Sequence, residues 1–302
     1  QKGTVDEQRA NVEATATQLA QLVEEGYELV LTHGNGPQVG NLLIQNEEAA
    51  DSVPPMPLDV LGAQSQGMIG YIFQQSLGNE LVRRGIRRPV VSVVTQIEVD
   101  GDDPGFQDPT KPVGPFFTEE RADQLMKLKG YIMKPQDNKG WRRVVASPAP
   151  LRIVERTVVE QLLGQGAIVI SGGGGGIPVL READGQHRGV EAVIDKDLAG
   201  CLLALDLEAD GFMILTDVSH VKLHFGTPQE KSLGEVDVDT MDRFIEEGHF
   251  GEGSMGPKVA AAVRFARSRQ KTSYVTSLSE ALQSLAGREG TRVVPVSAAS
   301  SR

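Results

Sequence analysis

The chain has 302 residues, of which 39% are hydrophobic, 5% are aromatic and 34 are glycine, a composition typical of a folded α/β enzyme and unlike that of a disordered or fibrous chain. The formal net charge of −11 disfavours nucleic acid and anionic lipid as partners, and the shortage of aromatic residues argues against a base-stacking surface. No apolar run approaches the roughly 20 residues of a membrane helix and the opening segment lacks the apolar core of a signal peptide, so we expect a cytoplasmic protein.

Hydrophobic periodicity predicts alternating helices and strands along most of the chain. The first helix begins at a capping box, Thr4 with Glu7, and ends at Gly26. Such alternation favours an α/β, three-layer αβα sandwich with a mainly parallel central sheet. The expected strands are 27–32, 89–95, 167–171, 211–216, 272–276 and 292–296, and the further helices are 38–50, 59–84, 153–163, 195–207 and 255–267.

The stretch 98–150 interrupts this alternation. It is rich in proline, glycine and charge, and its one helical pattern covers 118–129. We interpret it as an insertion that projects from the sheet as a lid or arm. A loop without structure is the alternative, but aromatic residues such as Phe116 and Trp141 favour packing within the insertion.

Two glycine-rich turns each follow a predicted strand. The first is LTHGNGPQVG, with Gly34, Asn35 and Gly36, and the second is SGGGGG, which contains Gly172, Gly173, Gly174 and Gly175. Glycine runs cost conformational entropy and are kept where side chains must be absent or φ is positive. Backbone amides at the ends of strands, beside helix N-termini, bind phosphate well. The alternative is that the glycines only allow a tight strand-to-helix turn. Two glycine-rich turns together, however, indicate a polyphosphate site.

Neither common nucleotide motif is present. Gly34, Gly36 and Gly40 are spaced one residue too widely for the dinucleotide fingerprint, and no strand ending in an acidic residue follows. The Walker pattern is also absent. A nucleotide would therefore be bound by another arrangement of glycines and cations.

Three lysines are candidates to neutralise phosphate. Lys196, between Asp195 and Asp197, and Lys258, after Gly256 and Pro257, stand at predicted helix starts, where helix dipoles attract anions. Lys111 lies in the insertion. A solvated surface charge is the usual role of any single lysine.

Other reactive side chains give weaker signals. His220 and His224 lack the third ligand of a metal site, so we expect no metal bound by the protein alone. The single Cys201 has the spacing of a buried structural thiol. His33 could orient a backbone carbonyl or act on substrate.

Several segments together resemble one family. THGNGPQVGNLL, PTKPVGPF, GWRRVVASPAP, SGGGGGIPV, GVEAVIDKDLAG and GSMGPK are similar to the carbamate kinases of the amino acid kinase superfamily. The resemblance implies reversible phosphoryl transfer between ATP and carbamate, giving ADP and carbamoyl phosphate, with Mg²⁺, in a homodimer. It also suggests a role in arginine or purine breakdown, and no nucleic-acid or membrane partner.

The resemblance implies roles for particular residues. Lys196 and Lys258 would neutralise the transferring phosphoryl group, Asp197 would hold them, and Lys111 would reach over from the insertion. The first glycine loop would support carbamate and the second would lie near the phosphates. The implied nucleotide contacts are Thr216, Asp217, Val218, Val221, Phe225, Met255, Gly256 and Pro257.

The implied organisation is a single domain, 1–302. Its carbamate-side lobe covers about 1–165, its nucleotide-side lobe about 166–302, and the inserted lid subdomain 98–150. The family pattern begins with an apolar strand ending in Gly-Gly-Asn-Ala, so we expect such a strand and loop to precede Gln1. Phe225 stands where we expect Tyr, which puts one nucleotide contact in question.

Two other functions stay open from the sequence. One is a different superfamily kinase for a small acid, such as acetylglutamate kinase. The other is a regulatory module that binds a nucleotide or an anion without turnover, although such a module has no need for two phosphate-facing lysines.

Overall fold

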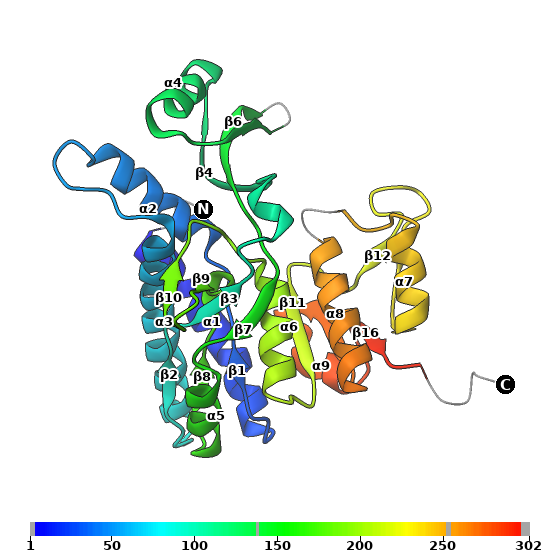
Figure 1. The fold of residues 1–302 in the computed structure, drawn as a ribbon. Coiled ribbons are helices and arrows are strands. Elements are labelled where there is room, and N and C mark those ends of the chain that lie inside the picture. Colours follow the sequence, from blue (N-terminus) through cyan, green and yellow to red (C-terminus); the bar gives the residue numbers. More distant parts are fainter. Residues whose placement is uncertain (1–3, 137–138, 252–254, 297–302) are drawn as a thin grey trace. The chain divides into compact units, whose positions relative to one another are not determined.

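The computed structural model describes residues 4–136, 139–251 and 255–296. Its chain forms two compact units, the first made of 1–13 and 28–199 and the second of 14–27 and 200–302. The helices, drawn in Figure 1, are α1 (Val5–Glu24), α2 (Gly36–Glu48), α3 (Leu58–Arg83), α4 (Glu119–Lys129), α5 (Arg156–Gly164), α6 (Lys196–Asp206), α7 (Val238–Glu246), α8 (Met255–Arg269) and α9 (Ala281–Leu285).

The predicted start of the first helix is confirmed. The Glu7 amide donates to the Thr4 hydroxyl and the Thr4 amide donates to the Glu7 carboxylate, both at 3.3 Å, which is a reciprocal capping box. Gly26 follows the helix with φ +91°, a conformation that favours glycine. The face with Ala16, Leu19 and Val23 is buried.

Two sheets form the centre of the first unit. The parallel sheet has the order β1 (Val30–Leu31), β8 (Ile168–Ile170) and β2 (Val90–Ser92), and the middle strand β8 is buried along its whole length. The mixed sheet has the order β10 (His187–Gly189), β9 (Ile177–Arg181), β3 (Gln96–Val99) and β7 (Pro150–Ile153). Helix α3 packs on β2 and α5 packs on β8. The glycine loops therefore follow strands that are neighbours in one sheet.

The insertion has a structure of its own. Strands β4 (Lys111–Phe117), β6 (Trp141–Val145) and β5 (Met133–Pro135) form an antiparallel sheet, and α4 packs against it with Ala122 and Leu125 buried. Figure 1 shows α4 and β6 projecting from the rest of the first unit. A loop without structure is therefore excluded for the described residues of this stretch.

The second unit contains a four-stranded mixed sheet. Its order is β11 (Phe212–Thr216), β15 (Ser273–Ser277), β16 (Thr291–Val294) and β14 (Glu235–Asp237), with β15 and β16 antiparallel and the other two pairs parallel. A short hairpin joins β12 (Lys222–Leu223) to β13 (Lys231–Ser232). Helix α8 packs on β11, β15 and β16.

The α/β class and the order of elements are confirmed, but some boundaries differ. Helix α5 begins at Arg156 rather than at 153 because Pro150–Ile153 pairs with β3 as strand β7. The pairing is less parallel than expected, since antiparallel strands β7, β10 and β16 join the sheets. Strands β3 and β9 and helix α7 were not predicted. They are short, and Pro178 obscured the strand pattern of β9.

None of the described helices combines the length and the apolar character needed to cross a bilayer.

Candidate active site

The two glycine loops lie against each other in the first unit. The Gly174 amide donates to the His33 carbonyl at 2.7 Å, and a Cβ on Gly174 would lie only 2.2 Å from Nδ2 of Asn35. A Cβ on Gly173 would lie 2.3 Å from Nε2 of His33. Side chains are therefore excluded at both positions because the first loop already fills the space. The sequence did not reveal which residues fill it.

The second loop turns sharply, and most of its amides are used within the protein. The Gly172 amide donates to the Thr95 hydroxyl at 3.0 Å, and the Gly175 and Gly176 amides donate to Gly172 and Gly173 carbonyls, each at 3.1 Å. Among the described residues, the Gly173 amide has no such acceptor. Hydrogen bonds within the protein thus occupy the amides of Gly172, Gly174 and Gly175. The expected position of Gly172 to Gly175 near the phosphates stays a prediction.

The carbonyl of Gly172 fixes the direction of that amide. It accepts from the Thr32 hydroxyl at 3.0 Å and from the Gly175 amide. In a trans peptide the C=O and the following N–H point in opposite directions. The Gly173 N–H consequently points away from Thr32.

Lys196 lies beside the first loop. A Cβ on Gly34 would make ordinary contacts at 3.5 and 3.7 Å with Cδ and Cε of Lys196. The ammonium group lies 2.9 Å from Oδ2 of Asp197, whose side chain is only 8% exposed, while that of Lys196 is 42% exposed. The partly exposed ammonium is thus anchored by a buried carboxylate. The expected contact of Asp197 with Lys258, and the role of these residues in phosphoryl transfer, stay predictions.

Asp195 connects the insertion to the start of α6. Its Oδ2 accepts from Nζ of Lys111 at 3.0 Å, and its Oδ1 accepts from the Asp197 amide at 2.9 Å. Burial raises the pKa of Asp195, but Lys111 and the helix amides together outweigh burial and leave this pKa below its ordinary value. In the sequence Asp195 is recognisable only as a neighbour of Lys196, because its partner Lys111 is 84 residues away.

Burial disfavours the charged form of His33. Burial lowers its pKa, against the smaller raising effect of its bond to the Gly34 carbonyl. Nδ1 lies 2.9 Å from that carbonyl oxygen and must donate to it, and the ring stacks on Phe73 with centroids 6.2 Å apart. The orienting role is the one that the structure supports.

The predicted nucleotide contacts lie in the second unit. Thr216 ends β11, and its hydroxyl donates to Asp217 at 3.0 Å. Val221 is fully buried and its amide donates to the Thr291 hydroxyl at 2.9 Å, whereas Phe225 is 71% exposed. Met255, Gly256, Pro257 and Lys258 form the first turn of α8. The role of these residues, and of Val218, stays a prediction, as does a phosphate site shared by Lys258 and Lys196.

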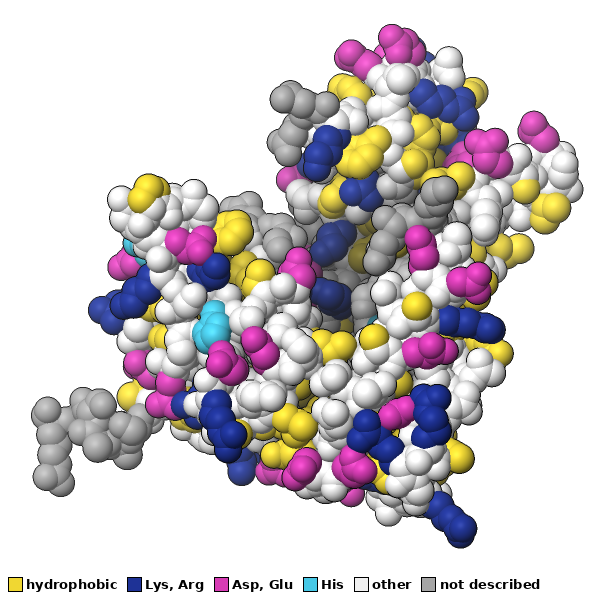
Figure 2. Space-filling view, turned by 180° about the vertical axis from the view of Figure 1, so that it is seen from behind, with side chains coloured by type: hydrophobic (Ala, Val, Ile, Leu, Met, Phe, Trp, Pro, Cys, Tyr) yellow, Lys and Arg dark blue, Asp and Glu magenta, His cyan; other side chains and the backbone are white. Residues whose placement is uncertain are grey.

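Charge and metal-binding groups are dispersed. Figure 2 shows Asp and Glu side chains scattered over the visible face among Lys and Arg. Among the described residues, no group of three or more His, Cys, Asp or Glu side chains could hold a metal ion.

Cys201 is fully buried, and burial raises its pKa to about 11, with a smaller opposing effect of Arg264, as expected for a structural thiol.

The model of the amino acid kinase family matches residues 3–277. The chain belongs to the amino acid kinase family.

Relatives and solved structures narrow the resemblance. A carbamate kinase of Pyrococcus furiosus is 51% identical over 297 residues, which cover 98% of this chain and 94% of the relative. A structure of a Giardia lamblia carbamate kinase bound to AMP-PNP is similar with a TM-score of 0.93 and 45% identity, covering 98% of this chain and 94% of that chain. An N-acetylglutamate synthase of Neisseria gonorrhoeae, at 14% identity and a TM-score of 0.57, covers 95% of this chain and 57% of its own and shares the fold alone.

Proposed function

We propose that this protein is a carbamate kinase, which transfers a phosphoryl group reversibly between ATP and carbamate and so interconverts carbamate with carbamoyl phosphate. The observation that carries the proposal is the position of Lys196, whose alkyl chain lies on Gly34 while a buried Asp197 holds its ammonium. A fixed cation thus stands beside a turn without side chains. Relatives of the same activity over nearly the whole length support the choice of substrates.

The residues fit the demands of the reaction. A carbamate oxygen attacks the γ-phosphorus, the new P–O bond forms as the bond to ADP breaks, and the protein must align the partners and neutralise the phosphoryl oxygens. Carbamate is already an anion and needs no general base. His33, with a lowered pKa and its Nδ1 hydrogen-bonded to a backbone carbonyl, agrees with this chemistry.

The proposed roles divide along the chain. Residues of the lobe 1–165, with Gly34, Asn35 and Gly36, support carbamate, and Lys111 approaches from the subdomain 98–150. The lobe 166–302 holds the nucleotide, with Gly172 to Gly175 near its phosphates. Lys196 and Lys258 neutralise the transferring group.

Mg²⁺ fits as an ion carried by the nucleotide. The described residues offer no protein cage for a metal, and Mg²⁺ in kinases is bound largely through substrate phosphates and water. When bound, Mg²⁺ shields phosphate charge.

We also propose that the protein forms a homodimer in the cytoplasm, where it makes ATP during arginine or purine breakdown.

The test is ATP formation from ADP and carbamoyl phosphate. A luciferase assay of the purified protein with Mg²⁺ is expected to show turnover, and acetylglutamate or aspartate offered with ATP should give none. Phosphorylation of acetylglutamate with no reaction of carbamoyl phosphate would establish the alternative kinase. Nucleotide binding without any turnover would establish the regulatory module.

A further inference from the structure

Two adjacent residues of α3 contact both glycine loops. Ser65 is fully buried and Gln66 is 3% exposed. Ser65 lies on an apolar face of α3. Leu61 and Ile69, four residues before and after it, are both buried. A polar pair on an apolar helix face needs hydrogen-bond partners, and the loops provide them.

Ser65 holds the first loop. Its hydroxyl accepts from Nδ2 of Asn35 at 2.8 Å and donates to the Gly62 carbonyl at 2.7 Å. Asn35 occupies the N-cap position of α2, yet its side chain makes no capping bond. The Asn35 amide is therefore directed to α3, and it covers Gly174.

Gln66 holds the second loop. Nε2 donates to the Gly173 carbonyl at 3.0 Å and to the Thr95 carbonyl at 3.2 Å, while Oε1 accepts from the Thr95 amide at 2.8 Å. The Thr95 hydroxyl, in turn, accepts a hydrogen bond from the Gly172 amide at 3.0 Å. One side chain thus fixes the carbonyl of Gly173 directly and the amide of Gly172 through Thr95.

We infer that Ser65 and Gln66 are positioning residues, which align Asn35 and the Gly173 amide for phosphoryl transfer without touching substrate. Both are anchored in one 26-residue helix, so the two loops move as a single body. Alignment to within a fraction of an ångström determines turnover more than ground-state binding. The inference depends on the proposed function for its kinetic consequence, but not for its structural one.

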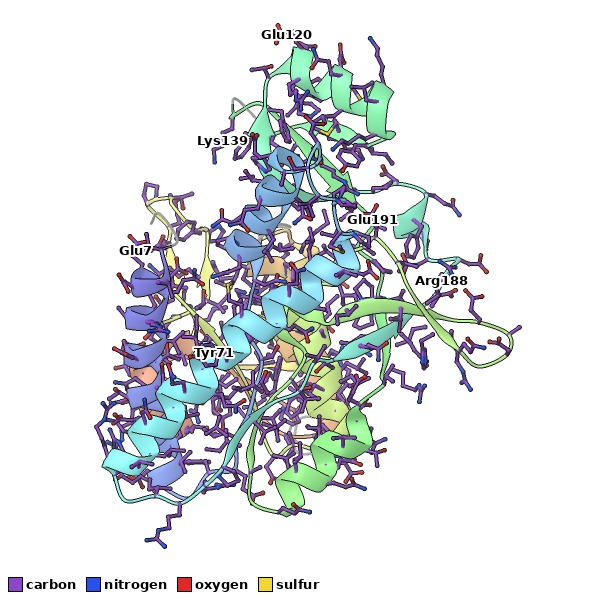
Figure 3. The ribbon with its side chains drawn as sticks, turned by 90° about the vertical axis from the view of Figure 1, so that its left-hand side faces the viewer. Glu7, Tyr71, Glu120, Lys139, Arg188 and Glu191 are labelled. Carbon is purple, nitrogen blue, oxygen red and sulfur yellow. The ribbon has the colours of Figure 1, made fainter. Side chains whose placement is uncertain are left out.

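Figure 3 shows helix α3 crossing the first unit, with the side chain of Tyr71 on the helix and that of Glu191 near its N-terminal end. Glu191 accepts from the Leu58 amide at 3.2 Å, and also pairs with Arg143 at 2.8 Å. The start of α3 is thus fixed independently of the loops. Removal of a loop contact should leave the helix in place.

The test uses Gln66→Leu, Gln66→Glu and Ser65→Ala with Gln74→Leu as the matched control. Gln74 also lies on α3 and accepts from a strand amide, that of Ser92, at 3.1 Å. Steady-state kinetics should show kcat of Gln66→Leu reduced by about 10- to 100-fold with KM for ADP and carbamoyl phosphate within about threefold. Gln66→Glu, which keeps the acceptor for the Thr95 amide, should recover part of kcat.

Amide hydrogen exchange gives a second readout that needs no turnover. Peptides covering 28–40 and 166–181 should exchange at least about tenfold faster in Gln66→Leu, and those covering 28–40 in Ser65→Ala, but not in Gln74→Leu. An inactive wild type would refute the proposed function while the exchange result still decides the positioning role. Unchanged exchange, or an active wild type with unchanged kcat in folded Gln66→Leu, would overturn the inference.

Discussion

Lys111 in the insertion and Asp195 before α6 are joined by an ion pair of 3.0 Å. The pair connects two segments that are 84 residues apart in the sequence. We expect Lys111→Met to reduce carbamate kinase turnover by about tenfold or more, because the proposed role of Lys111 is to bring a cation to the phosphoryl group. Lys134→Met is the matched control, since Lys134 lies in the same subdomain and pairs with an exposed carboxylate, Asp108. Equal kcat values for the two variants would reject the role of Lys111.

Lys196→Ala should lower kcat by about 100-fold with a smaller change in KM, because its charge matters most when the phosphoryl oxygens are most negative in the transition state. Lys258→Ala should behave in the same way. Lys271→Ala serves as the control, since its ammonium lies 3.4 Å from an almost fully exposed Asp210. Initial-rate kinetics of ATP formation measure the effect, and normal turnover by Lys196→Ala would remove this lysine from the mechanism.

Gly174→Ala should abolish activity and destabilise the first unit. The residue has φ +68°, and a Cβ would lie 2.2 Å from Nδ2 of Asn35. Gly185→Ala is the matched control, because it has φ +86° with nothing within 4 Å of its Cβ. The backbone conformation costs about 1–2 kcal/mol in both variants, so urea unfolding of Gly174→Ala should show a clearly larger loss. Similar losses of unfolding free energy in the two variants would mean that the loops rearrange to accommodate the added methyl group.

The Glu98 carboxylate predicts a pH-dependent contribution to stability. Its pKa is lowered to about 2, first by hydrogen bonds from Arg152 and against the effect of burial, with His187 contributing. Because the folded pKa is lowered, stability is present above the ordinary pKa of about 4.3 and is lost as the pH falls towards 2.

Arg152→Gln tests this contribution. Arg152 is half exposed, so we expect the free energy of unfolding at pH 7 to fall by only about 1 kcal/mol. The difference from wild type in urea unfolding should be constant from pH 7 to about 5 and should shrink below about pH 4.5. A difference that grows on acidification would contradict the assigned pKa direction.

Cys201 should resist modification in the folded protein. It is the single cysteine of the chain, it is fully buried, and its pKa is raised to about 11, so little thiolate is present at pH 8. Intact mass after iodoacetamide treatment should show no adduct without denaturant and one adduct in urea. Rapid labelling of the native protein would show that α6 opens readily.

The sequence by itself determined the local features. Spacing of apolar residues predicted the α/β elements, Thr4 and Glu7 predicted the helix start, and runs such as SGGGGG marked the two loops. These signals depend on neighbours within a few residues, which is why they can be read from one chain. A resemblance between motifs suggested the family, and the match over residues 3–277 confirms it.

Only the tertiary structure decided what the loops do. Residues of the second loop meet Thr32, His33 and Asn35 across about 140 residues of sequence, so the sequence could not show which neighbours exclude side chains from Gly173 and Gly174. In the same way, Ser65 and Gln66 could be noticed only as polar residues on an apolar face. Their partners come from distant segments, and hydrogen-bond geometry is fixed only when those segments pack together.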